Sequence, residues 1–299
     1  MADVLAIEDL HKRFGSGSHA VRANAGVTMR VGAGEVVGLL GHNGAGKTTL
    51  VNQVVGLLCP TSGSIRLDGV DAVANPALAR RLTNVQAQAN VPITGLTPLT
   101  AIDLVGRMRG GRPRQTRRRA EELIEALDLG EWARTPAQKI SGGVARLTAF
   151  AMCAVVPGRL VILDEPTNGL DPAGIEEVRR LLVELSGEGV TVMVSSHLLD
   201  EIDRMASTLG ILSGGRLVFQ GTRAELMERS VPDVLVVTST PQAVLSPQVL
   251  SGLVPAQAPG ASGQPSGPAL VPQGVRIPGM SKEAVAELIN RLVSTGVEL

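Results

Sequence analysis

Aromatic side chains are scarce in this chain of 299 residues, which has no tyrosine, one tryptophan and three phenylalanines. A hydrophobic core must therefore be built almost entirely from aliphatic side chains. The length is sufficient for one large domain and a smaller second one.

Charge of one sign and cysteine are also in short supply. The 28 Lys and Arg residues balance 28 Asp and Glu residues, whereas a general nucleic-acid binder usually has a strong basic excess. We therefore expect no direct nucleic-acid partner.

Cys59 and Cys153 are the only cysteines, which is typical of a reducing compartment and predicts no metal cluster. Cys153 lies in an apolar helical stretch, and we expect it to be a buried free thiol.

Long apolar runs are missing as well. No run of about 18 apolar residues occurs that could span a membrane. The N-terminus, MADVLAIEDL, is acidic and lacks the basic start and apolar core of a secretory signal. These absences predict a cytoplasmic chain that would reach a membrane only through a partner.

Short apolar runs alternate with helical patterns through the first two thirds of the chain, which predicts an α/β fold with a mostly parallel central sheet. A helical lobe is expected at about residues 90–155, where helical periodicity is interrupted at residues 110–113. Expected strands cover residues 4–7, 27–31, 35–39, 160–163 and 190–194, and expected helices cover residues 46–57, 142–155 and 172–186.

The composition changes after Ser230. Residues 254–274 are rich in Pro, Gly, Ala and Ser, which predicts a flexible insertion. Strand and helix patterns flank it on both sides. We therefore expect one domain over residues 1–229 and a small α+β domain over residues 230–299.

Residues 41–48 read GHNGAGKT and lie between an expected strand and an expected helix. This is the context and spacing of a phosphate-binding loop, in which backbone N–H groups at a helix N-terminus surround phosphates. Lys47 would reach the β- and γ-phosphates, and the Thr48 hydroxyl would bind Mg²⁺. The expected nucleotide contacts are Gly41, His42, Asn43, Gly44, Ala45, Gly46, Lys47, Thr48 and Thr49.

Two acids, Asp164 and Glu165, follow the apolar run LVIL. A carboxylate at the end of a buried strand beside a phosphate loop suits Mg²⁺, which makes Asp164 a candidate metal ligand. Adjacent acids at this position could also form the entry to a helix.

Four further motifs follow the phosphate loop in a fixed order: Ser141-Gly142-Gly143, LVILDE at 160–165, NGLD at 168–171, and His197. Together they resemble the ATPase subunit of an ATP-binding cassette (ABC) transporter over about residues 3–228. The resemblance implies a phosphate-loop NTPase cassette with an N-terminal antiparallel β subdomain, which binds ATP and Mg²⁺ and hydrolyses ATP.

The resemblance also implies roles for the remaining residues. Glu165 would be the general base and His197 would contact the γ-phosphate. Ser141, Gly142 and Gly143 would bind the γ-phosphate held by the opposite subunit of a head-to-tail dimer, although Val144 replaces the usual glutamine. Asp171 would link the two sites across that dimer, and it is equally suited to cap the following helix.

Two assignments leave alternatives open. Gln88 is the first choice for the glutamine that contacts Mg²⁺ and couples the nucleotide to the membrane partner, and Gln86 is the second. Phe14 would stack on adenine, and its alternative is a position in the core.

Residues 195–222, followed by a small C-terminal domain, resemble the daunorubicin-resistance and multidrug export branch of this family. That implies a transmembrane permease as partner, a homodimer or a heterodimer with a related cassette, and export of a drug, antibiotic or lipid-like compound from the cytoplasmic face of the membrane. The alternatives are a soluble cassette acting on ribosomes or DNA, which commonly has two cassettes or a long insertion, and a weakly active nucleotide sensor.

Overall fold

The computed structural model describes residues 3–17, 20–88, 95–229, 233–238, 240–251, 268–271, 274–277, 279–280 and 282–295. Contacts within the chain divide it into two compact units, Met1–Arg223 and Ala224–Leu299. This division falls six residues before the predicted domain boundary, at the start of helix α8 (Arg223–Arg229).

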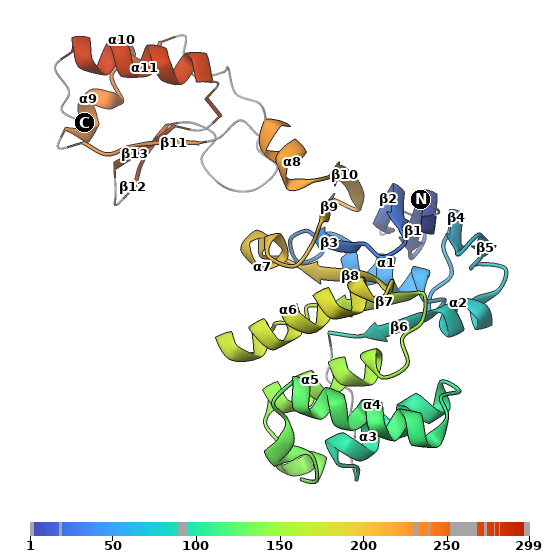
Figure 1. Ribbon diagram of the computed structural model, residues 1–299. Coiled ribbons are helices and arrows are strands. Elements are labelled where there is room, and N and C mark those ends of the chain that lie inside the picture. Colours follow the sequence, from blue (N-terminus) through green and yellow to red (C-terminus); the bar gives the residue numbers. More distant parts are fainter. Residues whose placement is uncertain are drawn as a thin grey trace. The chain divides into compact units, whose positions relative to one another are not determined.

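A six-stranded sheet forms the centre of the first unit, in the order β10-β9-β3-β8-β7-β6 (Figure 1). All neighbouring strands are parallel except β9 and β10. Strands β3, β7 and β8 are buried along their whole length, as expected where helices cover both faces of a parallel sheet. The strands are β3 (Val36–Leu40), β6 (Thr83–Gln86), β7 (Leu160–Asp164), β8 (Thr191–Ser196), β9 (Thr208–Ser213) and β10 (Arg216–Gly221).

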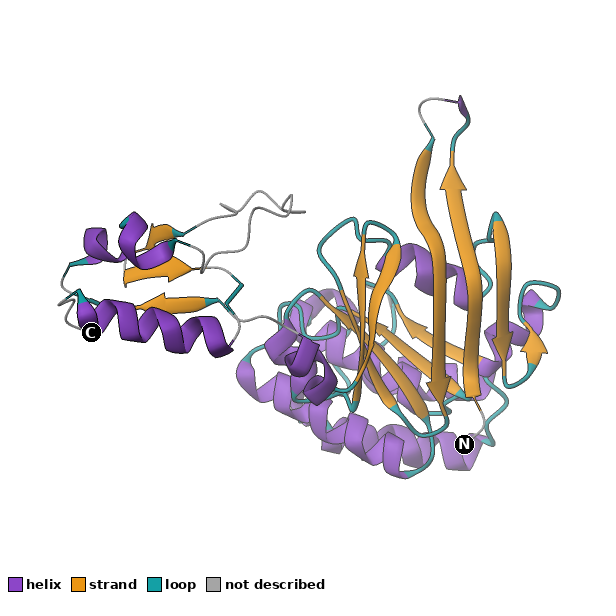
Figure 2. Ribbon diagram, turned by 90° about the horizontal axis from the view of Figure 1, so that it is seen from above, coloured by secondary structure: helices purple, strands orange, loops and turns teal. Residues whose placement is uncertain are grey.

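A second, antiparallel sheet has the order β2-β1-β4-β5, and its two long strands stand out in Figure 2. Its strands are β1 (Asp3–Phe14), β2 (Val21–Gly32), β4 (Ser62–Leu67) and β5 (Val70–Asp71). The first two run well beyond the expected residues 4–7 and 27–31. Register irregularities between Ile7 and His11 interrupt the apolar alternation, and such bulges hide the continuation of a strand from a pattern search.

Helices α3, α4 and α5 form the predicted lobe (Figure 1). A row of arginines on α4, at 117–119, pairs with glutamates and forms a solvated face. The helices of this unit are α1 (Lys47–Val54), α2 (Pro76–Leu82), α3 (Pro98–Met108), α4 (Pro113–Ala126), α5 (Gly142–Ala154), α6 (Pro172–Gly187) and α7 (Leu199–Asp203), with 3₁₀ turns at Gly130–Trp132 and Ala137–Lys139. No described helix combines the length and the apolar character needed to cross a membrane.

The core between the sheets is aliphatic, as the composition predicts. Its members are Val, Leu, Ile, Met and Ala side chains contributed by both sheets and by α1. Phe150 on α5 is an aromatic side chain that is almost fully buried. Cys153 on the same helix is buried and Cys59 is exposed, and both are free thiols.

The second unit is a small α+β fold. Its sheet has the order β11-β13-β12, and its buried core includes Val236, Val275, Ile277 and Leu288. The elements are β11 (Val234–Val236), α9 (Pro241–Val244), α10 (Pro247–Leu250), β12 (Ala269–Val271), β13 (Gly274–Ile277) and α11 (Lys282–Ser294).

Strand β12 corrects the predicted insertion at 254–274. Residues 269–271 pair with β13 in an antiparallel register. The short apolar run ALV follows a long Pro- and Gly-rich stretch, so composition alone conceals it, and only the hydrogen bonds to β13 define it as a strand. Residues 254–267, 272 and 273 of the predicted insertion lie outside the described residues.

Candidate nucleotide site

The phosphate loop connects β3 to α1, and its glycines are required by the backbone. Gly46, the N-cap of α1, has a φ of 102°, and a Cβ there would lie 2.3 Å from the Ala23 carbonyl oxygen. A Cβ at Gly41 would lie 2.6 Å from the Leu212 carbonyl oxygen. Only glycine fits these positions, so the loop conformation is specified by the sequence motif itself.

A cleft of about 320 Å³ opens over this loop. Lys47 reaches into the site with a side chain that is 7% exposed. Its Nζ donates to the Gly41 carbonyl at 2.6 Å and lies 3.5 Å from Glu165 Oε1. The residues that line the cleft are Val21, Arg22, Ala23, His42 to Thr49, Gln88, Asp164 and Glu165.

Thr48 and Asp164 bring two oxygen ligands together at the floor of the cleft. Thr48 Oγ1 donates to Asp164 Oδ2 at 2.9 Å, and Ser195 Oγ donates to Asp164 Oδ1. Asp164 is 2% exposed. A hydroxyl and a carboxylate are the hard oxygen donors that Mg²⁺ prefers, and Mg²⁺ usually binds through one or two such protein groups together with substrate phosphates. The residues present therefore fit this ion.

Glu165 follows β7 in a left-handed conformation, with a φ of 53°. Its N–H donates to the main-chain oxygen and the hydroxyl of Ser195, both at 3.1 Å. Its carboxylate lies 2.8 Å from His197 Nδ1 and accepts a bond from Asn168 at 3.4 Å. The predicted base and the histidine predicted to contact the γ-phosphate are therefore in direct contact, with the glutamate buried and His197 38% exposed.

The Ser141 segment lies outside this cleft. Ser141 is the N-cap of α5, and its Oγ accepts the Val144 N–H at 3.2 Å. Ser141 and Gly142 are exposed, and among the described residues Gly142 has no neighbour within 4 Å of an added Cβ. The capping bond uses only the backbone of Val144, so the loss of the usual glutamine leaves the cradle of N–H groups intact.

Asp171 occupies the same kind of position on α6. Its Oδ1 accepts the Gly174 N–H at 2.8 Å, which makes it the N-cap of that helix. It is not among the residues lining the cleft, so the structure shows its capping role within the chain and leaves the cross-dimer role as a prediction.

The structure separates the two candidate glutamines. Gln88 is exposed and lines the cleft. Gln86 ends β6, is 3% exposed, and donates from Nε2 to the Arg146 carbonyl at 3.3 Å. This placement favours Gln88 for contact with the nucleotide.

Phe14 ends β1, and 43% of its surface is exposed, which argues against a position in the core. It pairs with Val21, a residue that lines the cleft. The ammonium of Lys12 lies 5.1 Å from the ring centroid. The ring therefore lies next to the rim of the cleft, where stacking on a base remains a prediction.

Sequence reasoning missed several supporting residues. The Ser195 hydroxyl donates to the Asp164 carboxylate and accepts from the Glu165 N–H. The Asn168 amide donates to the Glu165 carboxylate. Glu201 accepts bonds from Thr167 and Ser196 and so joins the segments after β7 and β8. Arg146 was missed too. Its charge within the apolar helix α5 marks it in the sequence as a residue with a specific partner.

Comparison with known proteins agrees with this geometry. A family model described as ABC transporter matches residues 25–168. The daunorubicin resistance ATP-binding protein DrrA3 of Streptomyces coeruleorubidus is 35% identical over 227 residues, which covers 76% of this chain and 71% of the relative. The chain belongs to the ATP-binding cassette family of ABC transporters.

Solved structures resemble the cassette in the same way. The ATP-binding subunit of an ABC transporter superposes with a TM-score of 0.69 at 26% identity and covers 76% of this chain and 92% of that one. A dimeric cassette in a post-hydrolysis state with ADP and Pi has a TM-score of 0.65 at 22% identity, over 73% of this chain and 98% of that one, and shows the shared fold. This cassette is thus an ATP-binding ATPase of the ABC transporter family.

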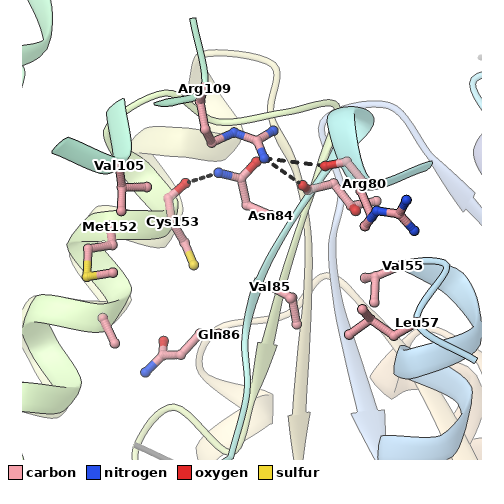
Figure 3. Close-up of a pocket in the computed structure, with 12 residues that line it drawn as sticks. Val55, Leu57, Arg80, Asn84, Val85, Gln86, Val105, Arg109, Met152 and Cys153 are labelled. Atoms are coloured by element: carbon pink, nitrogen blue, oxygen red, sulfur yellow. Dashed lines mark hydrogen bonds between the residues drawn. The ribbon is translucent and has the colours of Figure 1, made fainter. Parts of the chain in front are cut away.

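A second cleft of about 280 Å³ lies between the core and the helical lobe (Figure 3). Arg109, which follows α3, donates to the main-chain oxygens of Arg80, Arg81 and Thr83 across the cleft. Burial lowers the pKa of its guanidinium and raises the pKa of the Cys153 thiol to about 12. The lining residues are Val55, Leu57, Arg80, Thr83, Asn84, Val85, Gln86, Val105, Arg109, Ala149, Met152 and Cys153.

Proposed function

We propose that this cassette hydrolyses MgATP as one half of a head-to-tail dimer and powers a separate transmembrane permease. One observation carries the proposal: the two elements built to bind phosphate, the loop at 41–48 and the exposed Ser141 helix end, do not share a cleft within one chain. Each composite site would combine the loop of one subunit with Ser141, Gly142 and Gly143 of the other.

Hydrolysis would proceed through groups already in place. Lys47 and the N–H groups of the loop bind the phosphates and stabilise the charge that develops on them. The Glu165 carboxylate polarises the attacking water as general base, and His197 orients that carboxylate and contacts the γ-phosphate. Gln88, at the edge of the cleft, would sense the nucleotide.

Mg²⁺ would be held by Thr48 and Asp164, with Gln88 in reach, and would supply neutralisation of phosphate charge when bound. Depletion of divalent cations should therefore abolish hydrolysis and leave the fold intact, which far-UV circular dichroism in the presence of EDTA checks.

The second cleft suits a segment of the permease. It is lined by both the core and the lobe, so a bound segment would respond to movement between them, and Gln86 is one of its lining residues. Leu57 lines the cleft and is 65% exposed, and Met108 directly precedes the lining residue Arg109 and is 78% exposed. Exposed apolar residues at or beside a cleft are typical of a docking surface. The similarity to a daunorubicin resistance protein supports export of a drug, antibiotic or lipid-like compound. Through the permease, the cassette would lie at the cytoplasmic face of the membrane.

Co-expression with a candidate permease, for which a membrane protein encoded beside this gene would be the first choice, tests the proposal. Leu57→Asp and Met108→Asp should abolish co-purification and leave the ATPase activity of the isolated cassette within twofold. Val183→Asp is a matched control, because Val183 on α6 is 62% exposed and neither it nor its chain neighbours line the cleft. Equal recovery of all four proteins with the permease would contradict the docking site, and no ATP hydrolysis by the wild-type chain would contradict the function itself.

The alternatives have less support. The zero net charge does not favour binding to ribosomes or DNA. A nucleotide sensor would not need the contact between Glu165 and His197 at 2.8 Å.

A further inference from the structure

Arg146 is the only charged residue in α5, whose sequence is GGVARLTAFAMCA. The side chain is half-buried, and it forms no ion pair with any carboxylate of the described part of the chain. Instead, its guanidinium donates to two main-chain oxygens: Nη1 to Glu165 at 2.6 Å and Nη2 to Gln88 at 3.3 Å. A guanidinium has five donors in a fixed plane, so these two bonds orient two distant segments relative to α5.

The bond to Glu165 falls at a strained place. A positive φ is uncommon for a non-glycine residue and persists only where the surrounding structure holds it. The Glu165 N–H donates to Ser195, and the Glu165 carbonyl oxygen accepts from Arg146. The backbone of Glu165 is therefore fixed on both sides of its Cα. The direction of the Glu165 carboxylate follows from this backbone conformation, because the side chain leaves the same Cα.

The bond to Gln88 is reinforced by a second connection. The main-chain oxygen of Arg146 itself accepts a bond from Gln86 Nε2. The segment around Gln88 and the peptide of Glu165 are therefore both tied to one residue of α5. That residue lies five positions after Ser141, about 7.5 Å along the helix axis at 1.5 Å per residue.

We propose that Arg146 is a positioning residue that makes the orientation of Glu165 depend on the position of α5. The inference rests on the proposed function, in which the N-terminus of α5 binds the nucleotide of the opposite subunit. Engagement of Ser141 by that nucleotide fixes α5, and Arg146 then fixes the Glu165 peptide and the Gln88 segment of its own subunit. Hydrolysis at one composite site therefore responds to occupancy of the other.

Steady-state kinetics of the full chain test this role, with Arg146→Met, Arg146→Lys and the control Arg118→Met. Arg118 lies on α4, is 84% exposed and pairs with Glu122. Arg146→Met should lower kcat about 10²-fold, the cost of misplacing a catalytic group by roughly 1 Å. Its KM and its affinity for a fluorescent ATP analogue should stay within twofold. Arg146→Lys, which can reach one carbonyl, should lose about tenfold in kcat, and Arg118→Met should match the wild type.

A double variant separates positioning from a general structural effect. If Arg146 acts through Glu165, adding Arg146→Met to Glu165→Gln should not lower the residual single-turnover rate further, since residues that act as a unit are not additive. Multiplicative losses would overturn the proposal. So would a kcat within threefold of wild type for Arg146→Met or, if that variant does not fold, for Arg146→Lys. In either case an active wild type leaves the proposed function standing, whereas an inactive wild type removes both.

Discussion

The two elements proposed to bind phosphate, the loop at 41–48 and the Ser141 end of α5, differ in burial and in the contacts that they make. The loop at 41–48 lies beside a buried network in which Glu165 contacts both Lys47 and His197. Asp164 in the same network is hydrogen-bonded to Thr48 and Ser195. The start of α5 is exposed, and Ser141 contacts little beyond its own capping bond.

This difference teaches what each element needs in order to act. The loop site already has its catalytic groups in hydrogen-bond reach, so it is preorganised by the chain that contains it. The Ser141 end offers only N–H groups and a helix dipole, which attract an anion but perform no chemistry. In the proposed dimer the second element would therefore complete a site and would not constitute one.

Among the substitutions considered, Glu165→Gln should cause the largest loss of ATP hydrolysis, through the loop site. Removal of the base should lower the hydrolysis rate by about 10²- to 10⁴-fold, while ATP still binds because the loop is unchanged. Size-exclusion chromatography with ATP should show an accumulated dimer. A rate within threefold of the wild type would refute the role of Glu165.

Ser141→Arg should break the other element. A bulky side chain at the α5 N-terminus should obstruct the partner's phosphate and lower hydrolysis by about 10²- to 10³-fold, similar to the loss of a donor to developing charge. Nucleotide affinity of the monomer should not change.

Thr97→Arg is the matched control, because Thr97 is the N-cap of α3 and lies in the same lobe. Full activity of Ser141→Arg would show that the exposed helix end has no part in catalysis.

Phe14→Ala tests whether the rim of the loop cleft binds the base of the nucleotide, a contact that the exposed start of α5 does not offer. Stacking on a base contributes about 1–3 kcal/mol, so the affinity for ATP should fall about tenfold or more, with maximal turnover nearly unchanged. Titration with a fluorescent ATP analogue measures it, and Trp132→Ala in the lobe serves as the control. An unchanged affinity would leave Phe14 as a surface residue.

Asp171 should show the smallest effect. Asp171→Ala should cost about 0.5–2 kcal/mol because the N-cap of α6 is lost, which lowers Tm by about 1–8 °C for a unit of this size. Asp171→Asn keeps the cap and should restore Tm. If Asp171→Asn nonetheless reduces ATPase activity, the residue also acts across the dimer.

Sequence alone predicted those parts of the fold that local pattern specifies. The phosphate loop, the buried strand before Asp164 and the lobe helices follow from glycine spacing and apolar periodicity, which are properties of neighbouring residues. Strand β6, TNVQ, was missed because it is polar. Asn84 is nevertheless buried at 5% exposure, since its amide bonds to the main chain of Cys153, Val156 and Gly158.

The same limit applies to the site. Its motif residues were predicted because their order along the chain is diagnostic. The function proposed for Arg146 depends on two carbonyls 19 and 58 positions away, and no spacing rule connects a guanidinium to a particular main-chain oxygen. The charge of Arg146 within an apolar helix marks the residue in the sequence, but only a structure identifies backbone partners so far away in the chain.

The left-handed backbone of Glu165 has a consequence for protein engineering. A glycine at this position would adopt the same φ without steric cost, and an asparagine would adopt it more easily than a glutamate. Either substitution would also remove the carboxylate that pairs with the buried Lys47 ammonium, so relief of backbone strain at residue 165 is offset by an unpaired buried charge.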